Sequence, residues 1–171
     1  RMKRMSEILM VIAPDQFRDE ELFVTKRTLE SQGHKTLVVS TKTGEIQGVK
    51  GGAYQVETLV SQIRADDFDA LVFVGGGGAK VYFEDEAIWS LAQDMVKAGR
   101  VVAAICIAPV ILANAGLLEG KKATIFPSGA DQLRDKGALA QDLPVAVDGR
   151  LVTGTGPDAA EAFARAIDRL L

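Results

Sequence analysis

The chain has 171 residues, 47% of them hydrophobic and 25% charged, with a formal net charge of −3 at pH 7. This length predicts one domain with a full hydrophobic core. The acidic balance and the lack of a basic stripe argue against a nucleic-acid partner. The apolar run at residues 8–13 is too short for a signal sequence or a membrane span. A single cysteine permits no intrachain disulfide, so we expect a cytoplasmic protein.

Four apolar segments have the length of β-strands: residues 8–13, 36–40, 70–74 and 101–105. They are continuously apolar rather than alternating, which indicates a parallel sheet covered on both faces. Helical patterns lie at residues 19–32, 85–98 and 157–171, and Gly33 and Gly99 end the first two. This order predicts an α/β protein, a flavodoxin-like helix–sheet–helix sandwich with a mainly parallel central sheet.

Two further segments, residues 44–56 and 143–153, have the pattern of β-hairpins or strand extensions, the second around the turn at Asp148 and Gly149. No repeat, low-complexity tract or linker interrupts the chain, so residues 6–171 are interpreted as one domain. Residues 1–5 are interpreted as an N-terminal extension or an expression remnant.

The single cysteine, Cys106, lies where the strand at residues 101–105 meets a helix that begins near Pro109 and ends at Gly116. Proline suits a first helical turn because its missing N–H is not needed there. The spacing predicts a nucleophile elbow, in which the positive end of the helix dipole favours the thiolate. The alternative is a small buried residue that closes the strand.

A glycine run at residues 75–78 follows the third predicted strand. It is not a Walker loop, because Lys80 is followed by Val81 rather than by serine or threonine. The dinucleotide fingerprint is also missing, since no glycine follows the first strand. The glycines form either a plain turn or a loop that offers oxyanion-binding N–H groups beside Cys106.

Three consecutive acids, Asp19, Glu20 and Glu21, open the first predicted helix. Acidic residues there complement the helix dipole, which accounts for some of the three. One of them can also point over the sheet edge toward Cys106. Such a carboxyl group either stays protonated and donates a hydrogen bond to sulfur, or raises the pKa of the thiol.

The single histidine, His34, lies in the turn before the second strand, at the sheet edge opposite Cys106. We interpret it as an exposed turn residue. A Cys–His dyad or Ser–His–Asp triad within one chain is therefore not expected. No set of histidine, cysteine and carboxylate residues has the spacing of metal ligands, so neither a metal nor a cofactor is predicted.

Four motifs together support a resemblance: residues 17–22 at the first helix, 69–76 with a strand ending in Gly-Gly, 103–109 at the elbow and 153–157 in a closing loop. On these the chain resembles the superfamily of PfpI-type intracellular proteases and the parkinsonism-associated deglycase, with a class I glutamine amidotransferase-like fold. The resemblance covers nearly the whole length. It implies that Glu21 contacts Cys106. It also implies that the backbone N–H groups of Gly76 and Ile107 stabilise an oxyanion. It further implies that the pocket contains Gly75, Phe126 and Pro127.

The chain departs from this family pattern at three places. Proteolytic members have a histidine directly after the cysteine, where this chain has Ile107. Deglycase-like members have a histidine in the loop after the following strand, where this chain has Phe126. An acid that PfpI-type proteases take from a neighbouring subunit is missing around Ala79 and Lys80. These departures argue against peptidase activity.

The sequence leaves two functions open for Cys106. A third alternative is a scaffold whose elbow no longer has a function. The first is a cysteine-dependent hydrolase or lyase, glyoxalase- or hydratase-like, that acts on a small carbonyl compound or related electrophile. There Cys106 adds to the carbonyl carbon and Glu21 shuttles protons. The second is a non-catalytic redox sensor or stress-protective protein whose Cys106 becomes sulfenic and then sulfinic acid. Family members are generally dimers or larger, so the resemblance also implies a homo-oligomer.

Overall fold

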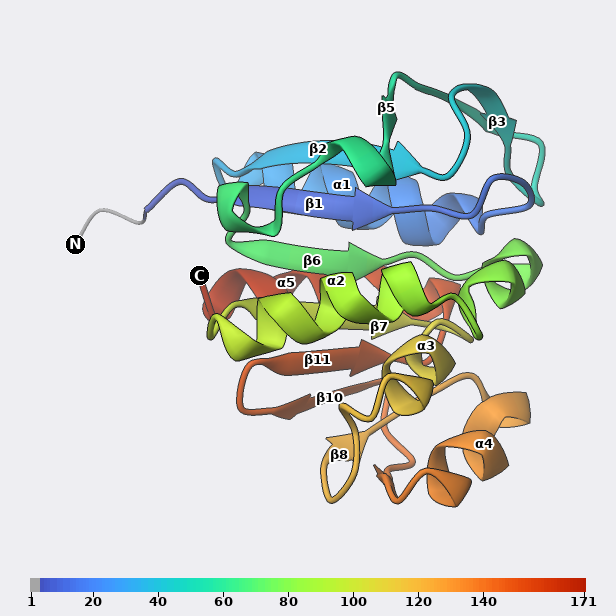
Figure 1. Ribbon diagram of the computed structural model, residues 1–171, viewed down its shortest axis with the longest axis vertical. Coiled ribbons are helices and arrows are strands. Elements are labelled where there is room, and N and C mark those ends of the chain that lie inside the picture. Colours follow the sequence, from blue (N-terminus) through green and yellow to red (C-terminus); the bar gives the residue numbers. More distant parts are fainter. Residues whose placement is uncertain (1–3) are drawn as a thin grey trace.

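The computed structural model describes residues 4–171, which form a helix–sheet–helix sandwich (Figure 1). The interpretation of residues 1–5 as an N-terminal extension falls partly on residues 1–3, which lie outside the described residues. The strands and α-helices are, in chain order, β1 (Glu7–Val11), α1 (Asp19–Ser31), β2 (Lys35–Ser40), β3 (Gly44–Gln47), β4 (Ala53–Val56), β5 (Thr58–Leu59), β6 (Ala70–Phe73), α2 (Glu86–Lys97), β7 (Val101–Ile105), α3 (Pro109–Asn114), β8 (Lys122–Ala123), α4 (Ala130–Asp135), β9 (Leu139–Ala140), β10 (Val145–Asp148), β11 (Leu151–Gly154) and α5 (Ala160–Arg169).

The central sheet has seven strands in the order β10-β11-β7-β6-β1-β2-β5. Every neighbouring pair in it is parallel except β10 with β11. The predicted mainly parallel sheet is therefore confirmed. The strand β7 has the predicted bounds, and all of its residues are buried because helices cover both faces of the sheet.

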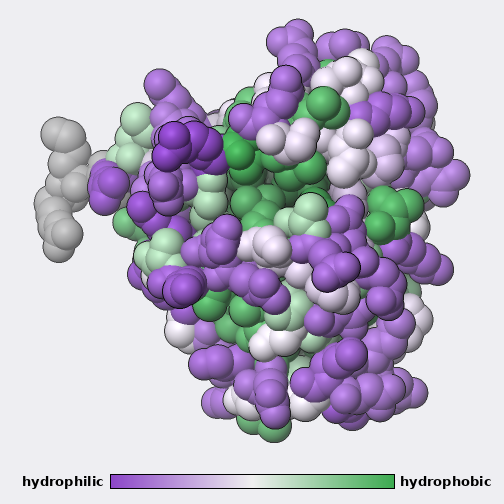
Figure 2. Space-filling model, viewed as in Figure 1, coloured by the Kyte–Doolittle hydropathy of each residue, from purple (hydrophilic) through white to green (hydrophobic). Residues whose placement is uncertain are grey.

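Two layers of helices enclose this sheet. Helices α1 and α5 pack together on one face, and α2 and α3 lie on the other (Figure 1). Alternate strand residues point to opposite faces, so Leu9 packs in the core beneath α2 whereas Met10 packs in the core beneath α1. On the face that carries α2, hydrophobic side chains gather in a hollow above that helix (Figure 2). None of the helices within residues 4–171 has the length and apolar character that a membrane crossing needs.

The two predicted hairpins have different places in the fold. Strands β3 and β4 pair antiparallel outside the central sheet. Strands β10 and β11 also pair antiparallel, but β11 lies parallel to β7 and so extends the central sheet. The helix predicted for residues 157–171 begins as a 3-10 turn at Pro157–Ala159 and continues as α5.

The predicted exposure of His34 is wrong, although its place at the opposite sheet edge is correct. Its exposed fraction is only 3%. The N–H of Ser6 donates to Nδ1 at 3.1 Å, and Nε2 lies 2.7 Å from Oδ1 of Asp168 in α5. Because Nδ1 accepts a hydrogen bond, the hydrogen of the ring is on Nε2, which donates to Asp168. The histidine is buried because it joins the start of β1 to the last helix.

Candidate active site

Cys106 lies in the turn between β7 and α3, at the carboxyl end of the parallel strands. Its φ of 65° is unusual for a residue other than glycine. Hydrogen bonds on both sides hold this strained backbone: its N–H donates to the Gly154 carbonyl at 2.9 Å, and its carbonyl accepts from the Phe126 N–H at 2.9 Å. The side chain is half-buried. The chain thus passes from strand through a tight turn into a helix at Cys106.

The carboxyl group of Glu21 lies beneath the cysteine. Glu21 is fully buried in the first turn of α1. Gly75 separates the two residues, and a methyl group on it would overlap the Glu21 carboxyl group and Cβ of Cys106. Only glycine at this position therefore allows the acid and the cysteine to approach each other.

Burial raises the pKa of Glu21 to about 7, while the Cys106 thiol and the Gly75 N–H act in the opposite direction. Neither of its carboxyl oxygens has a hydrogen-bond partner of good geometry within residues 4–171. An unpaired buried carboxyl group favours the neutral form. At neutral pH Glu21 can therefore both give and take a proton.

The pKa of the Cys106 thiol is also raised, first by burial and then by the negative charge of Glu21. The backbone N–H groups of Gly76 and Ile107 oppose this rise. The expected lowering of the thiol pKa by the helix dipole is outweighed, since α3 has only six residues and the side chain is partly buried. The raised pKa of Glu21 and the raised pKa of the thiol are the directions expected for a carboxyl group beside a cysteine.

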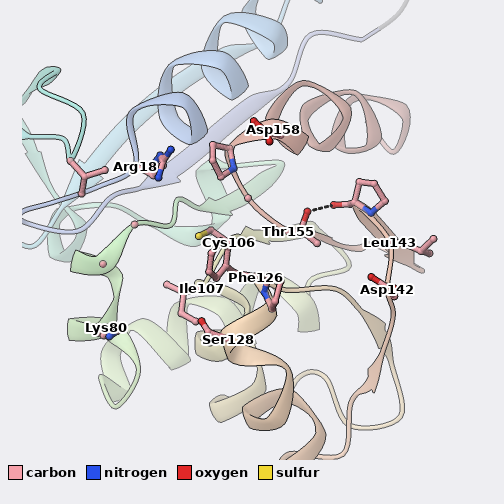
Figure 3. A pocket seen from close by; sticks show the side chains of 17 residues that line it. Arg18, Lys80, Cys106, Ile107, Phe126, Ser128, Asp142, Leu143, Thr155 and Asp158 are labelled. Atoms are coloured by element: carbon pink, nitrogen blue, oxygen red, sulfur yellow. Dashed lines mark hydrogen bonds between the residues drawn. The ribbon is translucent and has the colours of Figure 1, made fainter.

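A cavity of about 850 Å³ opens over the sulfur. Figure 3 shows Cys106 at its centre, with Phe126 and Ile107 close by. Phe126 is 43% exposed and, with Pro127, forms an apolar part of the wall. Gly75 lies below the cavity, between Glu21 and Cys106, rather than on its lining. The size of the cavity and its partly apolar lining suit a small organic ligand.

The three acids at the start of α1 have three different contacts. Glu21 lies against Cys106, and Glu20 binds the guanidinium of Arg18. Asp19 is 8% exposed and accepts hydrogen bonds from the N–H groups of Lys50 at 2.8 Å and Gly52 at 2.7 Å. Asp19 therefore anchors the β3–β4 loop, whose Val49 lines the cavity. Sequence reasoning missed this anchor and Arg18, because both depend on contacts formed only in the fold.

Replacing Asp19 with asparagine is expected to cost about 2 kcal/mol of unfolding free energy, because two charge-assisted hydrogen bonds to backbone N–H groups are weakened. Urea unfolding measures this cost. The matched control is Asp15→Asn, an exposed position in the preceding loop, where we expect a change within about 0.5 kcal/mol. Equal stability of the two variants would contradict the anchoring role.

Residues 6–169 match the DJ-1/PfpI family. The chain belongs to this family. It is 43% identical over 161 residues to the uncharacterized protein MJ0967 of Methanocaldococcus jannaschii, covering 92% of this chain and 78% of that protein. It is 34% identical to the deglycase PYRAB04690 of Pyrococcus abyssi, covering 95% of this chain and 98% of the relative. The crystal structure of a ThiJ/PfpI domain protein from Brachyspira murdochii superposes with a TM-score of 0.93 at 36% identity, over 96% of this chain and 95% of that one.

Within this DJ-1/PfpI chain, the residues predicted for the site come together around Cys106, and the histidine does not. His34 belongs to the opposite edge of the sheet, where it is buried against α5. No cluster of three or more histidine, cysteine or carboxylate residues that could hold a metal ion occurs in the described part of the chain. The titratable side chain that lies against the sulfur is the carboxyl group of Glu21.

Proposed function

We propose that this DJ-1/PfpI protein is a cysteine-dependent enzyme for small carbonyl compounds or related electrophiles. One observation carries the proposal: a buried carboxyl group with a pKa of about 7 lies against a cysteine in a strained turn beneath a ligand-sized cavity. A carboxyl group with a pKa near the working pH is suited to general acid–base catalysis. A purely structural cysteine needs no such neighbour.

In the proposed reaction, Glu21 takes the proton of the Cys106 thiol as the sulfur attacks the carbonyl carbon. A sulfur–carbon bond forms and the carbonyl π electrons move to oxygen. In this proposal the N–H groups of Gly76 and Ile107, which already interact with the sulfur, stabilise the oxyanion. Glu21 then returns the proton to that oxygen, giving a thiohemiacetal. This account needs neither a histidine nor a bound metal.

The named relative supports a carbonyl-related reaction, because the Pyrococcus abyssi protein is called a deglycase. Peptidase activity is not proposed, since Ile107 stands where the resemblance implies a histidine in proteolytic members. A homo-oligomer and a cytoplasmic location remain predictions from the resemblance and from the single cysteine. Sedimentation analysis of the purified protein would give the oligomeric state.

The test is consumption of glyoxal and methylglyoxal by the wild-type protein and by Cys106→Ala. We expect the wild type to consume one of these compounds and the variant to show only the background rate, because the variant lacks the attacking sulfur. Equal rates in the two proteins, with both folded by circular dichroism, would rule the proposal out.

A redox role is the second candidate. It is favoured by the half-buried sulfur at the cavity and by the two N–H groups of Gly76 and Ile107, which can hold sulfinate oxygens. Mild peroxide treatment followed by mass spectrometry separates the two functions. Selective gain of two oxygens on Cys106 without carbonyl turnover would favour the sensor. The raised thiol pKa works against fast oxidation.

A further inference from the structure

A cation, Arg18, lines the cavity beside Cys106 and is not part of the proposed reaction. Its side chain is 30% exposed. Its backbone N–H donates to the Gly75 carbonyl at 2.9 Å, which fixes the residue to the glycine loop under the sulfur. Figure 3 shows Arg18 on one side of Cys106, with Asp142 and Leu143 on the other side of the view. The position of Arg18 is therefore set by the same loop that holds the acid and the cysteine together.

The guanidinium of Arg18 has hydrogen-bond donors left over. Glu20 accepts from Nε at 3.0 Å and from Nη2 at 3.2 Å. A guanidinium carries five N–H donors, so this pair leaves the majority of them available to a ligand. The pair is also partly exposed, with Glu20 at 39%, and partly exposed ion pairs are weak. Glu20 thus orients Arg18 without neutralising it strongly.

The charge of Arg18 acts on the reacting groups. Glu20 is the main cause of the raised pKa of Arg18, and the charges of Glu21 and Cys106 add to it. An anionic ligand that approaches the thiolate or the ionised Glu21 is repelled by them. A nearby guanidinium offsets this repulsion and pairs well with a carboxylate. Lys80 also lines the cavity, but it is exposed, where water and salt screen its charge.

We propose that Arg18 is a specificity residue that directs the site toward carbonyl compounds carrying a carboxylate next to the carbonyl group, such as glyoxylate. This inference rests on the proposed function. The carboxylate binds the donors of Arg18 that Glu20 leaves unused, and Cys106 adds to the neighbouring carbonyl carbon. Glu21 takes the thiol proton, the sulfur–carbon bond forms as the carbonyl π bond opens, and the oxygen then takes that proton from Glu21.

The first test uses two alkylating reagents of nearly the same size, anionic iodoacetate and neutral iodoacetamide. Each forms a sulfur–carbon bond on Cys106 and releases iodide, and intact mass gives the rate. The ratio of the two rates cancels any change in the ionisation of the thiol, because both reagents meet the same sulfur. Replacing Arg18 with glutamine is expected to lower the iodoacetate-to-iodoacetamide ratio about fivefold, the size of a partly exposed ion pair.

The matched control is Arg27→Gln, which removes the same charge from an exposed position of α1. Its ratio is expected to stay within about twofold of the wild type. An unchanged ratio in Arg18→Gln, or an equal fall in Arg27→Gln, would overturn the inference. The experiment needs no turnover, so it can succeed or fail independently of the carbonyl-consumption test with Cys106→Ala.

A second test examines carbonyl compounds directly. Glyoxylate and glyoxal differ by one carboxylate in place of an aldehyde, and each protects Cys106 from iodoacetamide by adding to the sulfur. Glyoxylate is expected to protect the wild type at a lower concentration than glyoxal does, and this advantage shrinks about fivefold in Arg18→Gln. Equal protection by the two compounds in the wild type, or an advantage that survives in Arg18→Gln, would contradict the assignment.

Discussion

Replacing Glu21 with glutamine is expected to remove most of the carbonyl turnover and, at the same time, to stabilise the folded protein above pH 7. Turnover falls at least about 100-fold, the usual contribution of a general acid–base group. Stability rises because the buried carboxyl group has no good hydrogen-bond partner within residues 4–171, and glutamine has nearly the same shape without a charge. Stability and activity then change in opposite directions at one position.

The pH dependence of this effect follows from the raised pKa. In the unfolded chain the pKa of the carboxyl group has its ordinary value of 4.5, and burial raises the pKa in the folded state to about 7. The folded state therefore binds the proton more tightly, and the stability this provides is lost as the pH rises from 4.5 through 7. The full difference corresponds to about 3 kcal/mol. The advantage of the glutamine variant should grow from below about 1 kcal/mol at pH 5 to about 3 kcal/mol at pH 8.

Urea unfolding of the wild type and Glu21→Gln at pH 5 and pH 8 measures this difference, and carbonyl assays on the same samples give the turnover. Glu57→Gln is the control, because Glu57 is exposed and its variant should show no growing advantage. A Glu21→Gln protein that is less stable than the wild type at pH 8 would show that the ionised carboxyl group has a favourable partner. Full turnover in the variant would remove Glu21 from the reaction.

Replacing His34 with alanine is expected to cost about 3 kcal/mol of unfolding free energy. The substitution leaves the Ser6 N–H without its acceptor in a buried position and removes one hydrogen-bond donor from Asp168. It also leaves a cavity where the ring was. The melting temperature should fall by roughly 6–12 °C for a chain of this size.

The neighbouring variant Lys35→Ala is the control, because Lys35 is exposed at the start of β2 and we expect almost no effect there. Alkylation of Cys106 in folded His34→Ala should proceed at the wild-type rate, since the histidine lies at the far edge of the sheet. A slower alkylation would indicate that His34 influences the sulfur. An unchanged melting temperature would show that the buried hydrogen bonds contribute little.

The strands and the elbow were predictable because their signal is local. The apolar run of β7 ends at Cys106, and a proline three residues later begins the next helix. The family resemblance added Glu21, which composition and spacing alone placed only in an acidic cluster. The contact itself depends on Gly75, whose missing side chain lets α1 approach β7.

What could not be predicted depends on partners far away in the sequence. His34 is buried against Asp168, which lies 134 residues later in the sequence. No local sequence pattern predicts such a pair. The glycine run predicts either a plain turn or a loop that offers oxyanion-binding N–H groups, and neither pattern indicates the 3-10 helix that residues Gly77–Tyr82 form. Tyr82 anchors this helix by donating a hydrogen bond to the Ile12 carbonyl at 2.8 Å. The place of Arg18 beside Cys106 was not predictable, because it depends on the hydrogen bond from its backbone N–H to the distant Gly75 carbonyl.

The start of α1 also constrains how this protein can change. Successive residues of an α-helix point about 100° apart, and Asp19, Glu20 and Glu21 use three successive directions for the β3–β4 loop, for Arg18 and for Cys106. Inserting or deleting one residue within this first turn would rotate the acids that precede the change by that angle, because the buried face of α1 fixes the rest of the helix. The start of α1 therefore tolerates no change in length, because one such change after Glu21 would disturb the contacts with the β3–β4 loop, Arg18 and Cys106 together.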